Sequence, residues 1–192
     1  EGSWTFDGHQ LAGVRPHKVA KYGMVRTFQL TKALSRLTVM ENMRLGAQDQ
    51  RGESLFASIF PFLWRGQENE ITEQALQLLD SFNLAAKQDE LAGSLSGGQR
   101  KLLEMARALM VRPDMIMLDE PMAGVNPALT QSLLDHVREV RDRGTTVLFV
   151  EHDMDMVRDV SDWVIVMSQG QVIAEGPPHD VMGKEAGNDA YL

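Results

Sequence analysis

The chain has 192 residues, of which 43% are hydrophobic, and a formal net charge of −8. This length is enough for one domain with a sizeable core, or for one domain and a subdomain. The acidic balance argues against a general nucleic-acid binder. The absence of cysteine excludes disulfides, cysteine-ligated metals and thiol catalysis. No run reaches the ~20 apolar residues that a membrane span needs.

The first part of the chain alternates short strand and helix patterns, which predict a strand and turn at 1–8, a helix at 16–22, a strand and loop at 24–29 and a helix at 38–47. Thr38 and Glu41 stand three residues apart at the start of the last of these helices, in the spacing of a capping box. Residues 48–69 are predicted to be irregular, and apolar residues recur at helical spacing over 71–82.

Ser96, Gly97 and Gly98 stand at the predicted start of a long amphipathic helix. A helix start presents unpaired N–H groups and the positive end of the macrodipole. Glycine lets an anion approach that backbone closely, and a serine hydroxyl adds a donor. This pattern predicts a phosphate contact, and its simpler alternative is an ordinary serine N-cap after a loop.

Four apolar residues at 115–118 run directly into Asp119 and Glu120. A short apolar run without alternation predicts a strand buried on both faces of a parallel sheet. Active sites of such sheets lie at the carboxyl ends of their strands. There, one carboxylate can hold Mg²⁺ while the other orients or deprotonates an attacking water. The simpler alternative is a pair of acids in a loop.

The rest of the chain continues in the same alternation, with a helix from Asn126-Pro127 to about 144, a strand at 145–150, a short helix after 153, a hairpin of 163–167 with 171–174, and a terminal helix after 176–178. His152 lies at the end of the strand at 145–150. Strand–helix–strand alternation after Ser94 predicts an α/β layered fold.

The run 95–99, Leu-Ser-Gly-Gly-Gln, resembles the signature motif of ABC ATPases, and 115–120 resembles their Walker B motif. The resemblance implies a P-loop NTPase-like α/β core with a mainly parallel sheet plus an α-helical subdomain, truncated at the N-terminus. It implies three parts: 1–28, the rest of the N-terminal core; 29–98, the helical subdomain with Q-loop and signature; and 99–192, the core with Walker B, D-loop and H-loop.

The same resemblance implies a role for each candidate site residue. ATP would lie between two ATPase subunits, with Mg²⁺ as its metal. The implied roles are Ser96, Gly97, Gly98 and Gln99 as contacts to the nucleotide of the other subunit, Asn126 in the D-loop at the subunit interface, Asp119 as Mg²⁺ ligand, Glu120 as general base, Gln29 as water and metal orienter, and His152 as γ-phosphate contact. Taken alone, Gln29 and His152 also fit solvated or structural positions.

No segment of the chain matches G-x-x-x-x-G-K-[ST], the phosphate-binding loop that supplies a lysine to the phosphates and a hydroxyl to Mg²⁺. The chain is therefore expected to be either a fragment that has lost its first strands or a degenerate ATPase, and its start within a domain favours the fragment. In isolation, the 192 residues are expected to bind ATP poorly and not to hydrolyse it.

Details around the motifs resemble the ATPases of branched-chain (hydrophobic) amino acid importers, notably Gly124-Val125-Asn126-Pro127 and the run 151–154. Urea importers and the lipopolysaccharide exporter are the alternatives, together with a non-hydrolysing partner subunit or a soluble ABC ATPase acting on DNA or ribosomes. The implied partners are a second ATPase subunit, identical or different, transmembrane permeases and, indirectly, a substrate-binding protein, with no nucleic acid. The implied location is cytoplasmic, on the inner face of the plasma membrane. The aromatic segment within 48–69 is expected either to contact a permease or to pack on the helical subdomain.

Overall fold

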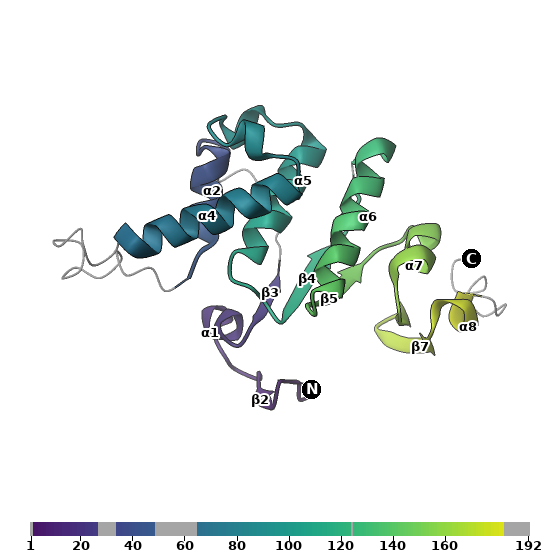
Figure 1. Ribbon diagram of the computed structural model, residues 1–192. Helices are drawn as coiled ribbons and strands as arrows, with labels where there is room; N and C mark the ends of the chain where they lie inside the picture. The colour runs from purple at the N-terminus through teal and green to yellow at the C-terminus, as the bar shows by residue number, and fades with distance from the viewer. Residues whose placement is uncertain (1, 27–33, 49–64, 124, 183–192) are drawn as a thin grey trace. The chain divides into compact units, whose positions relative to one another are not determined.

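The computed structural model describes residues 2–26, 34–48, 65–123 and 125–182 (Figure 1). The chain divides into two compact units, Glu1–Phe149 and Val150–Leu192, called here the larger and the smaller unit. The predicted three-part division at 28 and 98 stays a prediction. In chain order the elements are β1 (Thr5–Phe6), β2 (His9–Gln10), α1 (Pro16–Lys21), β3 (Met24–Arg26), α2 (Val39–Gly46), α4 (Arg65–Ser81), η4 (Ala85–Lys87), η5 (Ala92–Ser94), α5 (Gly97–Leu109), β4 (Met115–Asp119), α6 (Pro127–Asp142), β5 (Thr146–Val150), α7 (Met154–Val160), β6 (Val164–Ser168), β7 (Gln171–Gly176) and α8 (Pro178–Met182).

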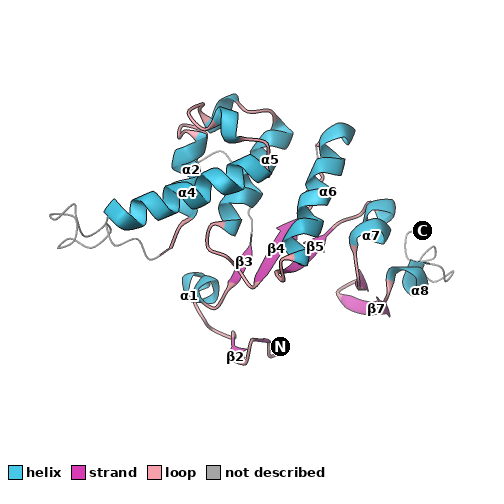
Figure 2. Cartoon of the chain, viewed as in Figure 1, coloured by secondary structure: helices cyan, strands magenta, loops and turns pink. Residues whose placement is uncertain are grey.

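A three-stranded sheet in the order β3-β4-β5 runs through the larger unit (Figure 2). Strands β3 and β4 are parallel, with Met24 opposite Met115. Within β4, Ile116 and Leu118 are buried, whereas Met115 and Met117 stay partly exposed. The prediction of full burial on both faces is therefore wrong for one face. Successive side chains point to opposite sides of a strand, and the described residues fully cover only one side of β4.

The helices α2, α4 and α5 pack against one another and form the best-buried part of the larger unit, called here the helical group. Val39 and Met43 of α2, Ala75 and Leu79 of α4, and Ala106 of α5 are all 0% exposed. The buried residues of α2 and of α4 are four apart, and α5 also buries Leu102 and Leu103, so each helix turns one apolar face inward.

A buried polar contact also joins two helices of this group. The side chain of Asn42, which is 1% exposed, donates to the carbonyls of Leu34 (3.2 Å) and Thr38 (2.9 Å) and accepts from Arg107 (3.4 Å). Because a buried amide must find such partners, this contact links the start of α2 to α5.

The capping box predicted for α2 is confirmed. Thr38 Oγ1 accepts from the Glu41 N–H (3.1 Å), and the Thr38 N–H donates to Glu41 Oε2 (2.7 Å). The start of α4 differs from the expectation, because Arg65–Asn69 is helical rather than irregular. Apolar periodicity begins only at Ile71, while the preceding Gln and Glu residues are good helix formers that carry no such periodicity.

The smaller unit contains α7, α8 and the antiparallel hairpin of β6 and β7. The predicted turn is confirmed, because Gln169 (φ 50°) and Gly170 (φ 78°) both adopt the left-handed conformation that a tight two-residue hairpin turn requires. Among the described residues of this unit, the buried apolar side chains come from α7 and α8, at Met156, Val157, Val160 and Val181. No helix among the described residues is long and apolar enough to cross a membrane.

Candidate functional site

The start of α5 carries the residues predicted to contact a phosphate. Ser96 is the N-cap: its Oγ accepts from the Gln99 N–H (3.2 Å), while its own N–H donates to Gln99 Oε1 (3.1 Å). This capping box leaves the N–H groups of Gly97 and Gly98 outside it. Ser96 and Gly97 are exposed, so the helix start can be reached from solvent.

The two glycines at this helix start have different surroundings. A Cβ on Gly97 would meet nothing nearer than 4.0 Å, so the space over this residue is open. Gly98 is buried, and a Cβ there would lie 2.6 Å from Cδ1 of Leu129 on α6. Gly98 therefore allows α5 and α6 to pack closely, a role that the sequence pattern did not reveal. Its predicted phosphate contact stays a prediction.

Asp119 ends β4, and its carboxylate is paired with the last residue of β3. Arg26 Nη2 donates to Asp119 Oδ2 at 3.0 Å, and the two side chains are 56% and 41% exposed. Parallel pairing brings both strand ends to one edge of the sheet. Because an exposed ion pair of this kind contributes only about 0–1 kcal/mol, Asp119 can exchange Arg26 for another cation at small cost.

Glu120 follows Asp119 in a strained backbone conformation. Its φ is 44°, in the left-handed region that residues with a Cβ seldom adopt. Such conformations cost about 1–3 kcal/mol and persist only where the surrounding structure holds them. Here the Glu120 carbonyl closes a turn by accepting from the Ala123 N–H at 3.1 Å.

Lys101, in the second turn of α5, contacts this same turn. Its Nζ donates to the carbonyls of Glu120 (3.1 Å), Pro121 (3.0 Å) and Ala123. An ammonium has three N–H donors, and these three carbonyls match that number. Sequence reasoning missed Lys101, since no local pattern tells that a helix lysine reaches a loop 19 to 22 residues further on.

Asn126 caps α6, as the sequence predicts. Its Oδ1 accepts from the Leu129 N–H (3.1 Å), and Pro127 occupies the first helical turn. The predicted role of Asn126 at a subunit interface is a separate matter and stays a prediction. Because Leu129 also packs on Gly98, the starts of α5 and α6 lie side by side around the Glu120 turn.

His152 belongs to the smaller unit and stands between β5 and α7. Its side chain is 72% exposed, and Nδ1 lies 3.8 Å from Oε2 of Glu151, whose own side chain is 1% exposed. Asp153 caps α7 by accepting from the N–H groups of Asp155 and Met156, both at 3.1 Å. The local structure therefore leaves the imidazole of His152 open to solvent. Gln29 lies outside the described residues.

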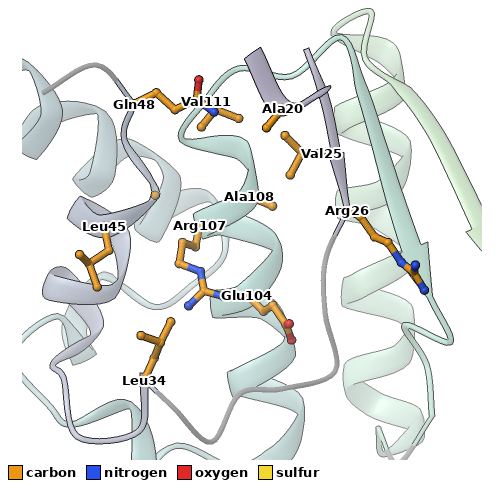
Figure 3. A pocket seen from close by; sticks show the side chains of 11 residues that line it. Ala20, Val25, Arg26, Leu34, Leu45, Gln48, Glu104, Arg107, Ala108 and Val111 are labelled. Carbon is orange, nitrogen blue, oxygen red and sulfur yellow. The ribbon is translucent and has the colours of Figure 1, made fainter. Parts of the chain in front are cut away.

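A cavity of about 300 Å³ lies within the larger unit (Figure 3). Figure 3 shows Arg107 extending from α5 on the side of Leu34, the Glu104 carboxylate pointing to the opposite side, and Arg26 reaching toward the neighbouring strand. Burial raises the pKa of the Glu104 carboxyl, against the opposing charges of Arg107 and Lys101. Burial likewise lowers the pKa of Arg107, which Glu104 opposes. Oε1 of Glu104 is buried and has no hydrogen-bond partner among the described residues. The cavity is lined by Ala20, Val25, Arg26, Leu34, Leu45, Gly46, Gln48, Glu104, Arg107, Ala108 and Val111.

The donor chemistry at the end of β4 suits Mg²⁺. Proteins usually hold this ion through one or two carboxylates, with waters and substrate phosphates completing the shell. Asp119 supplies one such carboxylate, which is partly exposed and forms an exposed ion pair with Arg26. Within the described ranges no three His, Asp or Glu side chains form a cluster that could hold a metal by itself. The predicted role of Asp119 as a Mg²⁺ ligand stays a prediction.

Residues 1–123 match the family model described as "ABC transporter". The chain belongs to the ABC transporter family. A relative from Archaeoglobus fulgidus, named "Probable branched-chain amino acid transport ATP-binding protein LivG", is 40% identical over 100% of this chain and 74% of its own length. "High-affinity branched-chain amino acid transport ATP-binding protein BraF" of Pseudomonas aeruginosa is 36% identical over 100% of this chain and 76% of its own.

The solved structures confirm the predicted fold class, an α/β ABC ATPase cassette. A crystal structure of the ADP conformation of an ATP-binding cassette of an ABC transporter aligns with a TM-score of 0.82 and 38% identity. The alignment covers 100% of this chain and 75% of that one. ABC ATPases bind ATP, typically with Mg²⁺, and act as dimers with membrane-spanning permeases. The assignment of the Ser96 helix start to the signature motif and of Asp119-Glu120 to Walker B stays a prediction.

Proposed function

We propose that the chain is the ATP-hydrolysing part of an ABC importer for branched-chain or other hydrophobic amino acids. The relatives named for branched-chain amino acid transport match it over its whole length at 36–40% identity. In this proposal the subunit lies on the cytoplasmic face of the membrane and pairs with a second ATPase subunit. Hydrolysis at the pair is coupled to permease subunits, which receive the solute from a substrate-binding protein.

The single observation that carries the proposal is the turn after β4, which presents Asp119 and Glu120 at the carboxyl end of a central parallel strand. Ligands of open α/β sheets bind at that edge. Asp119 would hold Mg²⁺ in place of its ion pair with Arg26. Glu120 would take a proton from the attacking water, and bound Mg²⁺ would neutralise charge on the phosphates.

The remaining residues would position the nucleotide. Ser96, Gly97, Gly98 and Gln99 would contact the ATP held by the partner subunit, with the exposed Ser96 and Gly97 making the nearest approach. Asn126 would lie at the subunit interface. His152 would donate to the γ-phosphate, and Gln29 would orient the water and the metal. Catalysis would be mainly electrostatic and positional, as in phosphoryl transfer generally.

The test is Glu120→Gln in the protein expressed from its complete reading frame, assayed for ATP turnover and ATP binding. Gln keeps the shape of the side chain but cannot accept the proton. The expected result is a loss of turnover on the order of a hundredfold or more, with ATP binding retained. The matched control is Glu139→Gln, the same change at a 54% exposed position on α6, which should leave turnover unchanged. Turnover of Glu120→Gln near the parent rate would remove Glu120 from its role.

The solute is tested separately, by uptake of labelled leucine, isoleucine and valine in cells that lack this reading frame. Restoring the parent sequence should restore uptake, and restoring Glu120→Gln should not. Unchanged amino acid uptake, with a defect in urea uptake or lipopolysaccharide export instead, would favour one of the related systems.

A further inference from the structure

Lys101 connects the start of α5 at Ser96 with the turn after β4 that carries Glu120. It lies five residues after Ser96 on α5, about 7.5 Å along the helix axis, and its ammonium contacts the carbonyls of Glu120, Pro121 and Ala123. The helix that starts at the proposed nucleotide contact therefore also holds the turn that carries the proposed base.

We propose that Lys101 is a positioning residue that holds Glu120 in its strained turn and ties that turn to the signature helix. The expected effect on catalysis rests on the proposed function, whereas the contact of Lys101 with the turn does not. Lys101 does not touch the reacting atoms; it acts on the backbone from which the Glu120 carboxylate extends.

The backbone of Glu120 explains why such a contact is needed. A φ of 44° is unfavourable for glutamate, so the turn would relax toward ordinary conformations unless something held it. The Ala123 N–H bond to the Glu120 carbonyl closes the turn. The Lys101 ammonium adds a charge-assisted bond to the same carbonyl oxygen and to two further carbonyls, and such bonds are stronger than neutral ones.

The neighbouring packing supports the same conclusion. Gly98, one turn before Lys101 on α5, is buried against Leu129 of α6. Asn126 caps α6 through the Leu129 N–H, just after the turn. The turn thus lies between α5, which contacts it through Lys101, and the start of α6, which follows it in the chain. A displacement of α5 would be passed through Lys101 to the backbone of Glu120.

A lysine in this position could instead serve stability alone. The two roles differ in what they predict for the reaction. Loss of stability alone would lower the amount of folded enzyme and leave the folded fraction working normally. Loss of positioning would lower kcat in the folded enzyme and leave the KM for ATP nearly unchanged. It would have no further effect in a variant that already lacks the Glu120 carboxylate.

The experiment combines Lys101→Met with Glu120→Gln in the protein from its complete reading frame. Methionine keeps the length of the side chain and removes its charge and donors. The expected result is a fall in kcat of about tenfold to a hundredfold, the range for misplacement of a catalytic group, with KM for ATP within about threefold of the parent. In the Glu120→Gln background, Lys101→Met should lower the residual single-turnover rate by less than about threefold. The matched control is Lys87→Met, a lysine paired with Glu90 on the surface, which should change neither constant.

Amide hydrogen exchange on the 192-residue chain tests the contact without any catalysis. The Ala123 amide, bonded to the Glu120 carbonyl, should exchange faster in Lys101→Met than in the parent or in Lys87→Met. Unchanged exchange would overturn the proposal, and so would an equal loss of rate with and without the Glu120 carboxylate. Failure of the proposed function is seen separately, in Glu120→Gln alone. If Lys101→Met does not fold, Lys101→Arg replaces it, because a planar guanidinium cannot direct three donors at converging carbonyls as an ammonium does.

Discussion

The helical group of the larger unit and the β6–β7 hairpin of the smaller unit are both rich in apolar residues, yet they bury them very differently. In the helical group, Met43 and Leu79 are 0% exposed. In the hairpin, Ile165, Met167 and Val172 are 52%, 64% and 55% exposed. The helical group buries its apolar side chains among its own helices, whereas these three hairpin side chains stay exposed among the described residues of their unit.

The difference shows that an apolar pattern predicts which side chains favour burial but not which element covers them. Three helices with apolar faces can enclose a common core. A two-stranded sheet has two faces and cannot cover either by itself, which is why isolated hairpins are only marginally stable. Strand β5 behaves like the hairpin, with Leu148 41% and Val150 62% exposed.

The largest expected effect comes from truncating the core of the helical group. Leu79→Ala should lower the free energy of unfolding by about 2–5 kcal/mol, because Leu79 is fully buried and its truncation leaves a cavity. Ile165→Ala in the hairpin should cost less than about 1 kcal/mol, because half of that side chain is already in water. Urea denaturation of the 192-residue chain measures both.

Leu76→Ala is the control for this pair, because Leu76 lies on the same helix as Leu79 and is 37% exposed. The loss of unfolding free energy for Leu76→Ala should lie between those for Leu79→Ala and Ile165→Ala. If Ile165→Ala proved as costly as Leu79→Ala, the hairpin would be well covered in solution, and the contrast between the two regions would be wrong.

The second prediction compares the two capping boxes at the edges of the helical group, at Thr38 and Ser96. Replacing either residue by Ala removes one cap acceptor and should cost about 1 kcal/mol of stability. Only Ser96→Ala should also weaken ATP-dependent turnover in the protein from its complete reading frame, since only that helix start is expected to meet a nucleotide. Thermal unfolding and ATPase assays measure the two effects. Equal turnover in the two variants would mean that Ser96 serves as an N-cap and has no role at the nucleotide.

Local features of this fold could be predicted from the sequence because their causes are local. A capping box depends on residues three apart, so Thr38–Glu41 was predicted and is confirmed. The Gln169–Gly170 turn depends on two residues with positive φ, and the cap at Asn126 depends on its own helix start. Each of these features can be identified within a few residues of sequence.

The contacts around the candidate site could not be predicted in that way, because they join residues far apart in the chain. Arg26 and Asp119 are 93 residues apart. Gly98 matches a phosphate-binding pattern, while its burial against Leu129 depends on how two helices pack. The motifs predicted which residue types would gather, but the backbone strain at Glu120 and its contact with Lys101 required the three-dimensional structure.

The smallest expected effect concerns Glu104, at the edge of the helical group. Burial raises the pKa of its carboxyl above the ordinary value, so the folded state holds this proton more tightly than the unfolded state does. Stability from this group is therefore present in acid and is lost as pH rises through the folded pKa. At pH 7 the charged carboxylate costs stability, although its attraction to Arg107 offsets part of that cost.

Glu104→Gln should accordingly raise the melting temperature at pH 7, by on the order of 1–3 °C, and the gain should shrink as pH falls toward 4. Glu73→Gln, the same change at an exposed position on α4, is the control and should show no such trend. Thermal unfolding at several pH values between 4 and 8 measures the difference. A lower melting temperature for Glu104→Gln at pH 7 would mean that the attraction between Glu104 and Arg107 outweighs the burial of the charge. The edge of the helical group would then be held by that ion pair, rather than by apolar packing like that of its centre.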